Sequence, residues 1–464
     1  MMLLYIYFKA VKKIINFKLL FFFLFSLFLY SCAVKEICIF KTLPDNVTYE
    51  MRRPYFWISK LKDPDRIIMS YNEIKFFNEN IAKKKLTLPF DTRELQLKSD
   101  YIKENILWAL EYFKIKPYYF HDSMEADKDF FADMEDNINI KNFRENYIKY
   151  GIVSKFASQR LLPTDTALFS APDKFFFDRL QNNGFDIGNF LLILHESKDK
   201  LWYYTISEYS SGWIKKENIA LCSFDDFSLL NNSRFIVVTE AKADIFSDRQ
   251  LSDYWQTIRM GNRLTLLSDE NGVYKVLLPI RNKKGFLQYK YGYISRRDAN
   301  IGYLGYTQKN VILQSFKFLN TPYGWGDMYM EQDCSKFIQE IFFTFGFKLP
   351  RNSSAQTKFG DIVYNRDLKQ KLHSHNLENL IYTKAKAGIT LLQLQGHIML
   401  YIGNQNGKNY VIHDTFGYNE KINGRIYTNV VNKVEVTTLD IGESSESGSL
   451  LDRIKNVVIL DLND

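Results

Sequence analysis

The spacing of apolar residues changes near residue 150, and the change separates regions of different structure. Between residues 51 and 148 apolar side chains recur every three or four positions, as at Ile74, Phe77 and Ile81 and again between residues 101 and 113. This is the period of an amphipathic helix. Residues 51–148 are therefore predicted to be mostly helical.

From residue 149 short apolar runs are separated by turn residues, as strands and hairpins are. One block covers residues 149–228 and contains the runs 191–194 and 202–206. A second block covers residues 229–306 and opens with the run 235–238. Two successive β-rich segments of this size predict two small barrels.

The third region, residues 307–464, mixes both periods. Its clearest helix begins at Asp333-Cys334-Ser335, because apolar residues then fall on one helical face, at 337, 338, 341, 342 and 345. Asp333 is placed to cap the start of this helix and Gly346 to cap its end. Cys334 is therefore predicted to lie in the first turn, away from the apolar face.

A hairpin is predicted downstream of this helix. In residues 396–403 alternate positions place Ile398, Leu400 and Ile402 on one face, and His397 on the other. Asn-Gln-Asn-Gly at 404–407 is a turn signal, and residues 409–414 form the second strand. A loop centred near Gln405 places His413 roughly opposite His397.

The composition describes a folded protein of several domains. A chain of 464 residues fits three or four small cores, and 16% aromatic residues suit β-rich modules with carbohydrate- or peptide-binding surfaces. Lysine and arginine are spread along the chain, and no basic run is interleaved with aromatic residues. Nucleic-acid binding is therefore not expected.

The N-terminus has the pattern of a targeting signal. Residues 19–30 are an apolar run, shorter than the roughly 20 residues of a spanning helix and within the roughly 7–15 of a signal-peptide core. Ser31 before Cys32 resembles a bacterial lipobox, which predicts a lipoprotein signal peptide over residues 1–31, lipidation of Cys32 and a tether over 32–50. The alternative is an uncleaved signal anchor. Cleavage would remove four lysines and lower the formal charge from +8 to +4.

Four cysteines occur in the chain, and two of them, Cys38 and Cys222, have no assigned role. In an oxidising compartment these two could pair. The alternative is that Cys38 stays free in the tether and Cys222 is a small buried hydrophobe.

Cys334 and the two hairpin histidines are the candidate catalytic groups. The N–H groups and the dipole at a helix N-terminus favour thiolate over thiol. A thiolate needs a base, and His397 with His413 as its orienting partner supplies one. The alternative is a hairpin with two structural histidines, but the cysteine at the helix start favours catalysis. No metal site is predicted, because His373-Ser-His375 has no cysteine or acid cluster at zinc spacing.

Four motifs carry a resemblance to a known family: residues 322–326 (Pro-Tyr-Gly-Trp-Gly), 333–335, 349–353 (Leu-Pro-Arg-Asn-Ser) and 396–403. They resemble the NlpC-type peptidoglycan endopeptidases, in the multidomain form with a helical stabilising segment. The resemblance covers about residues 60–464. It implies an α+β multidomain fold, namely a helical N-terminal stabilising domain (51–148), two SH3-like β-barrels (149–228 and 229–306) and a papain-like cysteine peptidase domain (307–464).

The resemblance also implies residue roles. Cys334 would be the nucleophile, His397 the general base and acid, and His413 the orienting residue. Tyr323 would bind the oxyanion together with the backbone N–H of Cys334. Five further residues would contact the substrate: Asp333 and Tyr209 at the free amine of an N-terminal L-Ala, Ser335 and Ser353 at D-Glu, and Trp325 as a wall of the pocket.

The sequence departs from the family pattern at three positions near these motifs. Asp327 replaces a glycine, Gln332 replaces a frequent arginine, and Lys336 follows Cys-Ser where a small residue is usual. None of them removes a catalytic group, although Lys336 could lower the pKa of Cys334 or change the preferred substrate charge. Residues 357–390 form a long connection before His397 that leaves the rim of the pocket open to question.

These features predict a lipid-anchored, exported cysteine peptidase that cuts the γ-D-Glu–diamino acid bond of peptidoglycan stem peptides, acting as a monomer on peptidoglycan or muropeptides. No cofactor is implied. Two alternatives remain, a weakly active or inactive lipoprotein that binds cell wall through its SH3-like domains, and an enzyme that performs acyl transfer.

Overall fold

The structure is a computed structural model that describes residues 37–39, 41, 43–87, 99–145, 147–368 and 372–462. The predicted signal peptide (1–31) and the predicted lipidation at Cys32 lie outside these residues. Within the described ranges no helix is both long and apolar enough to cross a membrane.

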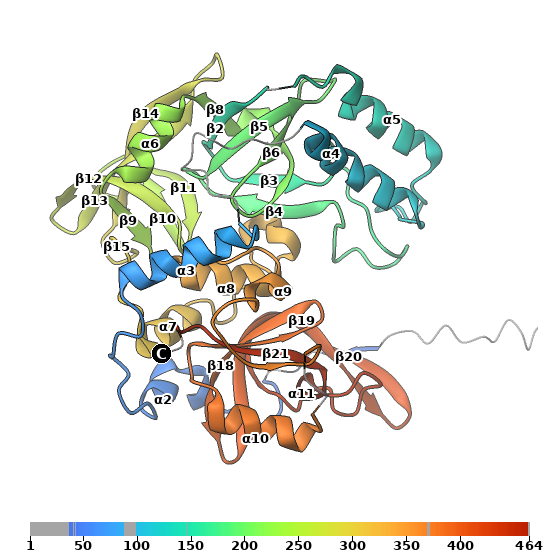
Figure 1. The fold of residues 1–464 in the computed structure, drawn as a ribbon, viewed down its shortest axis with the longest axis vertical. Coiled ribbons are helices and arrows are strands. Elements are labelled where there is room, and N and C mark those ends of the chain that lie inside the picture. The colour runs from blue at the N-terminus through green and yellow to red at the C-terminus, as the bar shows by residue number, and fades with distance from the viewer. Residues whose placement is uncertain are drawn as a thin grey trace, which may run out of the picture.

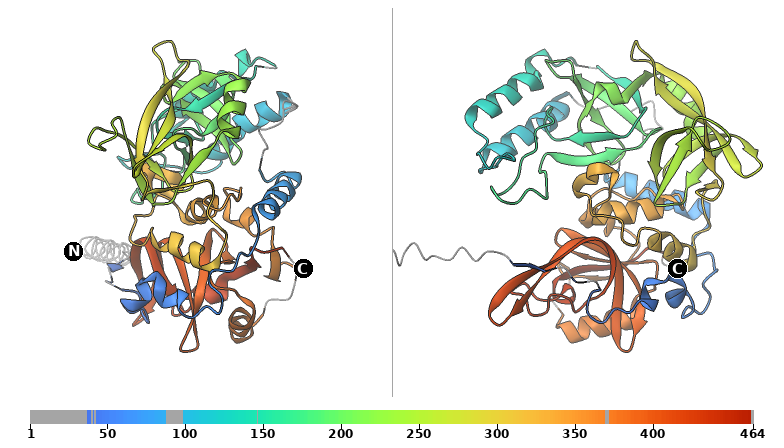
Figure 2. Two further views of the ribbon diagram at one scale, coloured as in Figure 1. Left: turned by 90° about the vertical axis from the view of Figure 1, so that its left-hand side faces the viewer. Right: turned by 180° about the vertical axis from the view of Figure 1, so that it is seen from behind.

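The chain forms two halves with a helical layer between them (Figure 1). One half contains two small β-sheets and helices α4 and α5, and the other contains a larger twisted sheet. Helices α3 (Tyr71–Lys83), α8 (Cys334–Phe343) and α9 (Ser353–Gln356) lie between the halves, as the view from behind also shows (Figure 2). The N-terminus of α8 therefore lies where several parts of the chain meet.

The two small sheets have the same strand order. The first is ordered β4-β3-β7-β6-β5-β2-β8 and the second β11-β10-β14-β13-β12-β9-β15. Each strand of the second sheet therefore has the same place as the strand of the first sheet whose number is lower by seven. The strands of the first are β2 (Lys149–Val153), β3 (Ala157–Arg160), β4 (Gln181–Phe185), β5 (Phe190–Glu196), β6 (Trp202–Ile206), β7 (Ser211–Lys215) and β8 (Ile219–Cys222). Those of the second are β9 (Phe235–Val238), β10 (Lys242–Phe246), β11 (Tyr254–Arg259), β12 (Arg263–Glu270), β13 (Val273–Arg281), β14 (Leu287–Ser295) and β15 (Ala299–Ile301).

The predicted boundary between these two domains needs a correction. Helix α6 (Phe224–Asn232) spans the proposed division at residues 228 and 229. A capping box at Ser223 and Asp226 fixes its start. The helix is therefore the connection between the two sheets rather than part of either barrel.

The N-terminal helices form as predicted but do not make a domain of their own. Helices α2 (Pro54–Ile58) and α3 pack into the core of the larger sheet, through residues such as Trp57 and Phe77. Helices α4 (Ser99–Lys114) and α5 (Lys128–Ile138) instead pack on the first small sheet, with Ile106 and Phe113 against Trp213. The predicted stabilising domain over 51–148 is thus split between two cores, because an amphipathic pattern does not say which surface it will cover.

The larger sheet has the order β1-β20-β19-β18-β17-β21-β16. Its strands are β1 (Ile37–Ile39), β16 (Asp361–Asn365), β17 (Thr390–Leu394), β18 (His397–Gln405), β19 (Lys408–Ile422), β20 (Arg425–Thr438) and β21 (Ile454–Ile459). The other helices in this part of the chain are α7 (Gln308–Phe316), α10 (Ser374–Lys384) and α11 (Leu450–Arg453). Strand β1 pairs in parallel with β20. Part of the predicted 32–50 tether is therefore an edge strand of this sheet.

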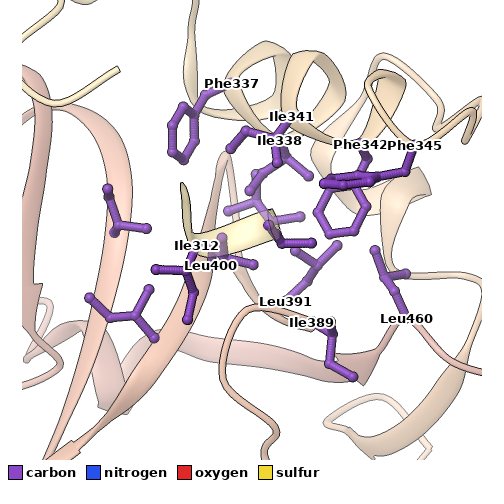
Figure 3. Packing of buried hydrophobic residues seen from close by; sticks show 14 of the residues in the cluster. Ile312, Phe337, Ile338, Ile341, Phe342, Phe345, Ile389, Leu391, Leu400 and Leu460 are labelled. Atoms are coloured by element: carbon purple, nitrogen blue, oxygen red, sulfur yellow. The ribbon is translucent and has the colours of Figure 1, made fainter. Parts of the chain in front are cut away.

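Helix α8 has the predicted ends, and its predicted apolar face is buried. The expectation that Cys334 lies away from the buried face was wrong, because the helix is buried on every side from Cys334 to Phe342 and Cys334 belongs to the same core. The Asp333 side chain accepts a hydrogen bond from the Lys336 N–H, which caps the start. At the other end Gly346 has φ +91°, and the N–H groups of Gly346 and Phe347 donate back to the carbonyls of Phe343 and Phe342, a Schellman motif. Figure 3 shows the apolar face of α8 packed on residues of the sheet, among them Leu391 and Leu400.

Candidate active site

Cys334 is the first residue of α8 and faces the start of strand β18. Its Sγ lies 4.0 Å from the Gly396 carbonyl oxygen, and the Ile398 backbone N–H is also within its reach. These two residues flank His397 in the sequence. The end of α8 that carries Cys334 is thus packed against the start of the strand that carries His397.

The two predicted histidines are joined by a hydrogen bond. His397 Nε2 lies 2.7 Å from His413 Nδ1, and His413 Nε2 lies 3.0 Å from Thr437 Oγ1 on β20. If His397 donates through Nε2, and His413 in turn donates to Thr437, then Nδ1 of His397 is free to accept the Cys334 proton. In that arrangement of protons, Thr437 and His413 orient His397 as a base.

The predicted register of this hairpin was wrong by two residues. The ladder pairs Leu400 with Ile412, so His413 lies diagonally across from His397 rather than opposite it. The turn is Asn406-Gly407, with φ of +52° and +79°, which is the geometry of a two-residue type I′ turn and lies beyond Gln405. Both histidines still share one face, and diagonal neighbours remain within reach of ring side chains.

Burial sets the protonation of the catalytic pair. It raises the pKa of the Cys334 thiol, and the nearby Asp333 carboxylate adds to the rise. It lowers the pKa of His397 to about 4, with Arg453 contributing. Burial thus opposes the thiolate that the helix N-terminus favours, because a buried charge loses its hydration. The lowered pKa of His397 keeps its imidazole neutral and able to accept the thiol proton.

The acid limb of the pH–activity profile is expected near pH 4. His397 accepts the thiol proton only while it is neutral, and its lowered pKa keeps it neutral until the pH falls through about 4. Measurement of kcat/KM from roughly pH 3 to 8 tests this, with the thiolate absorbance of the free protein as an independent reading. A limb with its midpoint near 6.5, the ordinary value for histidine, would contradict the assignment.

Asp333 is held by an arginine. Arg351 Nη1 donates to Asp333 Oδ1 at 2.9 Å, and Arg351 Nη2 donates to Asp333 Oδ2 at 2.6 Å. Asp333 also accepts bonds from Ser335 Oγ at 3.0 Å and from the Gly326 N–H at 3.3 Å. The carboxylate charge is thus balanced before any substrate binds, so the role of Asp333 in binding a free amine stays a prediction.

A cleft of about 800 Å³ opens over Cys334. It is lined by all five predicted substrate residues, Asp333, Ser335, Ser353, Trp325 and Tyr209, and by Tyr323. Burial raises the pKa of Tyr323, so its phenol stays protonated and can donate a hydrogen bond. Residues of α4 and of the first small sheet form the opposite side, including Asn105, Trp108 and Arg179.

Tyr209 lies at the border between this cleft and a second cavity of about 240 Å³. Its ring packs on that of Phe343, with centroids 5.4 Å apart, and its hydroxyl is hydrogen-bonded with Glu208. After Glu208, the ionisable side chains that interact electrostatically with Tyr209 are Tyr303 and Arg263. Both of them line the second cavity. This orientation counts against a role for its hydroxyl in holding a substrate amine beside Asp333.

Two of the departures from the family pattern face each other. Lys336 Nζ lies 3.4 Å from the buried Asp327 carboxylate. The same carboxylate forms ion pairs with Arg351 at 2.9 Å and with Arg259 at 3.2 Å. Burial alone would raise the pKa of Asp327, but the three cations lower it. Arg259 in turn pairs with Asp186 at 2.8 Å. This buried ionic network joins both small sheets to the N-terminus of α8, and it directs Lys336 away from Cys334.

The described residues of the connection over 357–390, which exclude 369–371, do not line the cleft. They contribute β16 and α10, whose Leu377 and Ile381 are buried with Met399 on the other face of the sheet. His373 caps the start of α10 and His375 lies in its first turn. Among the described residues no group of three or more histidine, cysteine or acidic side chains could hold a metal ion.

The two remaining described cysteines are both free. Cys38 lies on β1 of the larger sheet and Cys222 on β8 of the first small sheet. Burial raises the pKa of Cys222 to about 12. Of the two alternatives left open by the sequence, the structure has the one in which Cys38 and Cys222 form no disulfide with each other.

A thiol at a helix N-terminus and an imidazole that a second side chain orients are the groups that cysteine hydrolases use. Comparison with known proteins gives the family. Residues 320–437 match the NlpC/P60 family and residues 167–215 match an SH3 domain of the SH3b1 type. The chain carries an NlpC/P60 domain together with a bacterial SH3 domain.

Two similar proteins extend this finding. A γ-D-glutamyl-L-lysine dipeptidyl-peptidase from Bacillus cereus is 26% identical over 196 residues, which are 42% of this chain and 54% of that protein, so the chain spans about half the length of this curated relative. A solved NlpC/P60 endopeptidase from Photobacterium damselae subsp. piscicida superimposes with a TM-score of 0.75 at 21% identity, covering 92% of this chain and 99% of the other. The second likeness shows that the fold extends over nearly the whole chain.

Sequence reasoning missed three polar residues of the site. Arg351 lies within the Leu349–Ser353 motif but received no role, although an arginine two residues before a pocket serine was a usable signal. Thr437 orients His413 from a strand whose sequence carries no motif. Gln181 donates to the Gly326 carbonyl at 2.8 Å and so fixes the loop that carries Trp325 to the first small sheet.

Proposed function

We propose that this protein is a cysteine endopeptidase that hydrolyses the γ-D-Glu–diamino acid bond of peptidoglycan stem peptides. The observation that carries the proposal is the position of Cys334 at the N-terminus of α8, beside the hydrogen-bonded His397–His413 pair and open to a cleft of about 800 Å³. The match of residues 320–437 to the NlpC/P60 family supports the chemistry, and the activity of the Bacillus cereus relative, a γ-D-glutamyl-L-lysine dipeptidyl-peptidase, supports a γ-D-glutamyl bond.

The proposed reaction uses the residues that line the cleft at Cys334. His397 takes the proton of Cys334, and the thiolate attacks the γ-carbonyl carbon of D-Glu to form a tetrahedral oxyanion. The N–H of Cys334 and the Tyr323 hydroxyl donate to this oxyanion. His397 then gives its proton to the departing amine, and a thioester remains on Cys334. Water, deprotonated by His397, hydrolyses the thioester and restores the thiol.

Export and lipid anchoring belong to the same proposal. The apolar run at residues 19–30 followed by Ser31-Cys32 supports a lipoprotein that faces the cell envelope, where its substrate occurs. Acyl chains on Cys32 would hold it at the membrane.

Product analysis tests the proposed bond. The protein lacking residues 1–31 is incubated with L-Ala-γ-D-Glu-diaminopimelate and, separately, with the L-Lys peptide, and the products are identified by mass spectrometry. The expected products are L-Ala-γ-D-Glu and the free diamino acid. The matched control is the peptide of identical composition in which Glu is linked through its α-carbonyl, which should stay intact. Binding of the γ-linked peptide without cleavage would refute the enzyme and favour the cell-wall-binding lipoprotein.

A further inference from the structure

A segment of the first small sheet reaches over the catalytic domain. The connection between β3 and β4, residues 161–180, places Phe177 against three aromatic rings of that domain. The ring centroids are 4.8 Å from Phe416, 5.4 Å from Trp325 and 6.1 Å from Tyr323. This packing fixes the end of the segment beside the cleft that contains Cys334.

Arg179 follows two residues later and stacks on the same rings. Its guanidinium carbon lies 5.0 Å from the Trp325 ring centroid and 5.7 Å from that of Phe177. Stacking of this kind restrains the planar guanidinium and leaves its N–H edges exposed. Arg179 and Trp325 both line the cleft, so these edges belong to the same space as the Cys334 thiol.

The guanidinium of Arg179 has no hydrogen bond or ion pair with any part of the chain that the structure describes, and only its backbone N–H donates, to the Leu168 carbonyl. The neighbouring Asp178 is bonded to Arg160 instead. Arg351, the other arginine of the cleft, is paired with Asp333 and Asp327. Arg179 is therefore a half-buried, positioned cation whose donors are available to a ligand.

The charges that line the cleft favour an anionic ligand. Lys85, Arg179, Arg351 and Asp333 are its ionisable lysine, arginine and acidic side chains among the described residues. Because Arg351 balances Asp333, the remaining charge is positive. A stem peptide carries carboxylates at D-Glu and at the diamino acid, and a carboxylate is the group that a guanidinium binds through two parallel hydrogen bonds.

We propose that Arg179, supplied by the SH3-type domain, binds a carboxylate of the stem peptide and makes the enzyme selective for the acid over the amide. The inference rests on the proposed function, since it names a specificity-determining residue for that substrate. The two possible carboxylates are the α-carboxylate of D-Glu and the carboxylate of the diamino acid. Amidation of either removes the charge and one acceptor without changing the size of the peptide.

The test compares three peptides on two proteins. The peptides are L-Ala-γ-D-Glu-diaminopimelate, the same peptide with a carboxamide at the D-Glu α position, and the same peptide amidated at the diamino acid. With the wild-type chain one of the two amidations should raise KM about ten- to hundredfold, the range for a charge-assisted hydrogen-bond pair, and change kcat little. Arg179→Gln should have the raised KM for all three peptides.

Two further variants make the comparison specific. Arg179→Lys keeps the charge but not the paired N–H groups, so it should recover only part of the discrimination. Arg296→Gln is the matched control, because Arg296 also lies over an aromatic ring, that of Tyr274 at 6.0 Å, but beside the second small sheet and away from the cleft. It should behave as the wild-type chain. A normal KM in Arg179→Gln, or no effect of either amidation on the wild-type chain, would overturn the proposal.

Binding separates this inference from the proposed function. The affinities of the three peptides for Cys334→Ala protein, with and without Arg179→Gln, are measured by calorimetry. If the wild-type chain cleaves no peptide but Arg179→Gln removes the preference for the acid in binding, the proposed hydrolysis fails and the role of Arg179 stands. If hydrolysis occurs and the affinities are the same with and without Arg179, the role of Arg179 fails and the hydrolysis stands.

Discussion

Replacement of Cys334 by alanine is expected to abolish hydrolysis, with a fall in kcat of about 10⁶-fold, as for other enzymes that lose their nucleophile. Alanine has no group that can form the thioester, and neither His397 nor Tyr323 can replace it. The fold should remain, because the position starts a helix in which alanine is favourable and Asp333 still caps it. The affinity for the stem peptide should also remain. Steady-state kinetics, calorimetry and thermal unfolding of the same preparation measure the three quantities.

The control is Cys222→Ala, because Cys222 is a partly buried cysteine on β8 outside the cleft. It should keep wild-type kinetics. Measurable turnover by Cys334→Ala, above the background from contaminating wild-type enzyme, would show that Cys334 is not the nucleophile. Loss of activity in Cys222→Ala at full folding would likewise show that the site is not the one described.

Replacement of Asp327 by alanine is expected to cost about 3–5 kcal/mol of stability, the effect of removing one partner from a buried charge cluster. Asp327 is fully buried, and the variant would leave Arg259, Lys336 and Arg351 with fewer counter-charges. Denaturant unfolding followed by intrinsic fluorescence measures the loss. Adding Lys336→Met to Asp327→Ala should recover part of the lost stability, because it removes one uncompensated buried cation. The double-mutant cycle of these two substitutions then gives the coupling energy between Asp327 and Lys336.

The surface ion pair of Asp65 and Lys309 gives the matched control. These side chains are 2.8 Å apart, with Asp65 68% exposed. Exposed pairs contribute about 0–1 kcal/mol, so Asp65→Ala should unfold almost as the wild-type chain does. An equal effect of Asp327→Ala and Asp65→Ala would contradict the structural role of the buried ionic network.

Local features of the fold were predictable from the sequence because they depend on short-range rules. The period of apolar residues identified α8, and Asp333 and Gly346 identified its ends. The alternation in β18 also predicted its two faces, since Ile398 is buried in one core and Met399 in another. These signals lie within about ten residues of one another, which is the range over which caps and periodicity act.

Features that depend on distant partners were not predictable. The amphipathic pattern gave α3 and α4 correctly, but only the three-dimensional packing divides them between two cores. A three-residue strand such as β1 has too few positions to show a period. The register of the hairpin depended on which residues form the turn, and a one-residue change in a turn shifts every pair.

The chemistry of the site shows the same division. The order Asp333-Cys334-Ser335 and the histidines of the hairpin are sequence motifs, so the reactive groups could be named. The raised pKa of Cys334 comes first from burial, which depends on tertiary packing and not on the motif itself. Arg179 belongs to a different domain from Cys334 and reaches the cleft through aromatic packing. A single sequence contains no sign of such a convergence.

The most direct measurement of the central claim is the intact mass of the protein during reaction with an activated substrate. An L-Ala-γ-D-Glu γ-ester with a good leaving group acylates faster than the thioester hydrolyses, so the intermediate accumulates and can be trapped in acid. The account predicts one added L-Ala-γ-D-Glu acyl group on the wild-type chain, located at Cys334 after proteolysis, and none on Cys334→Ala. An adduct of equal yield on Cys334→Ala, or one located at another residue, would contradict it.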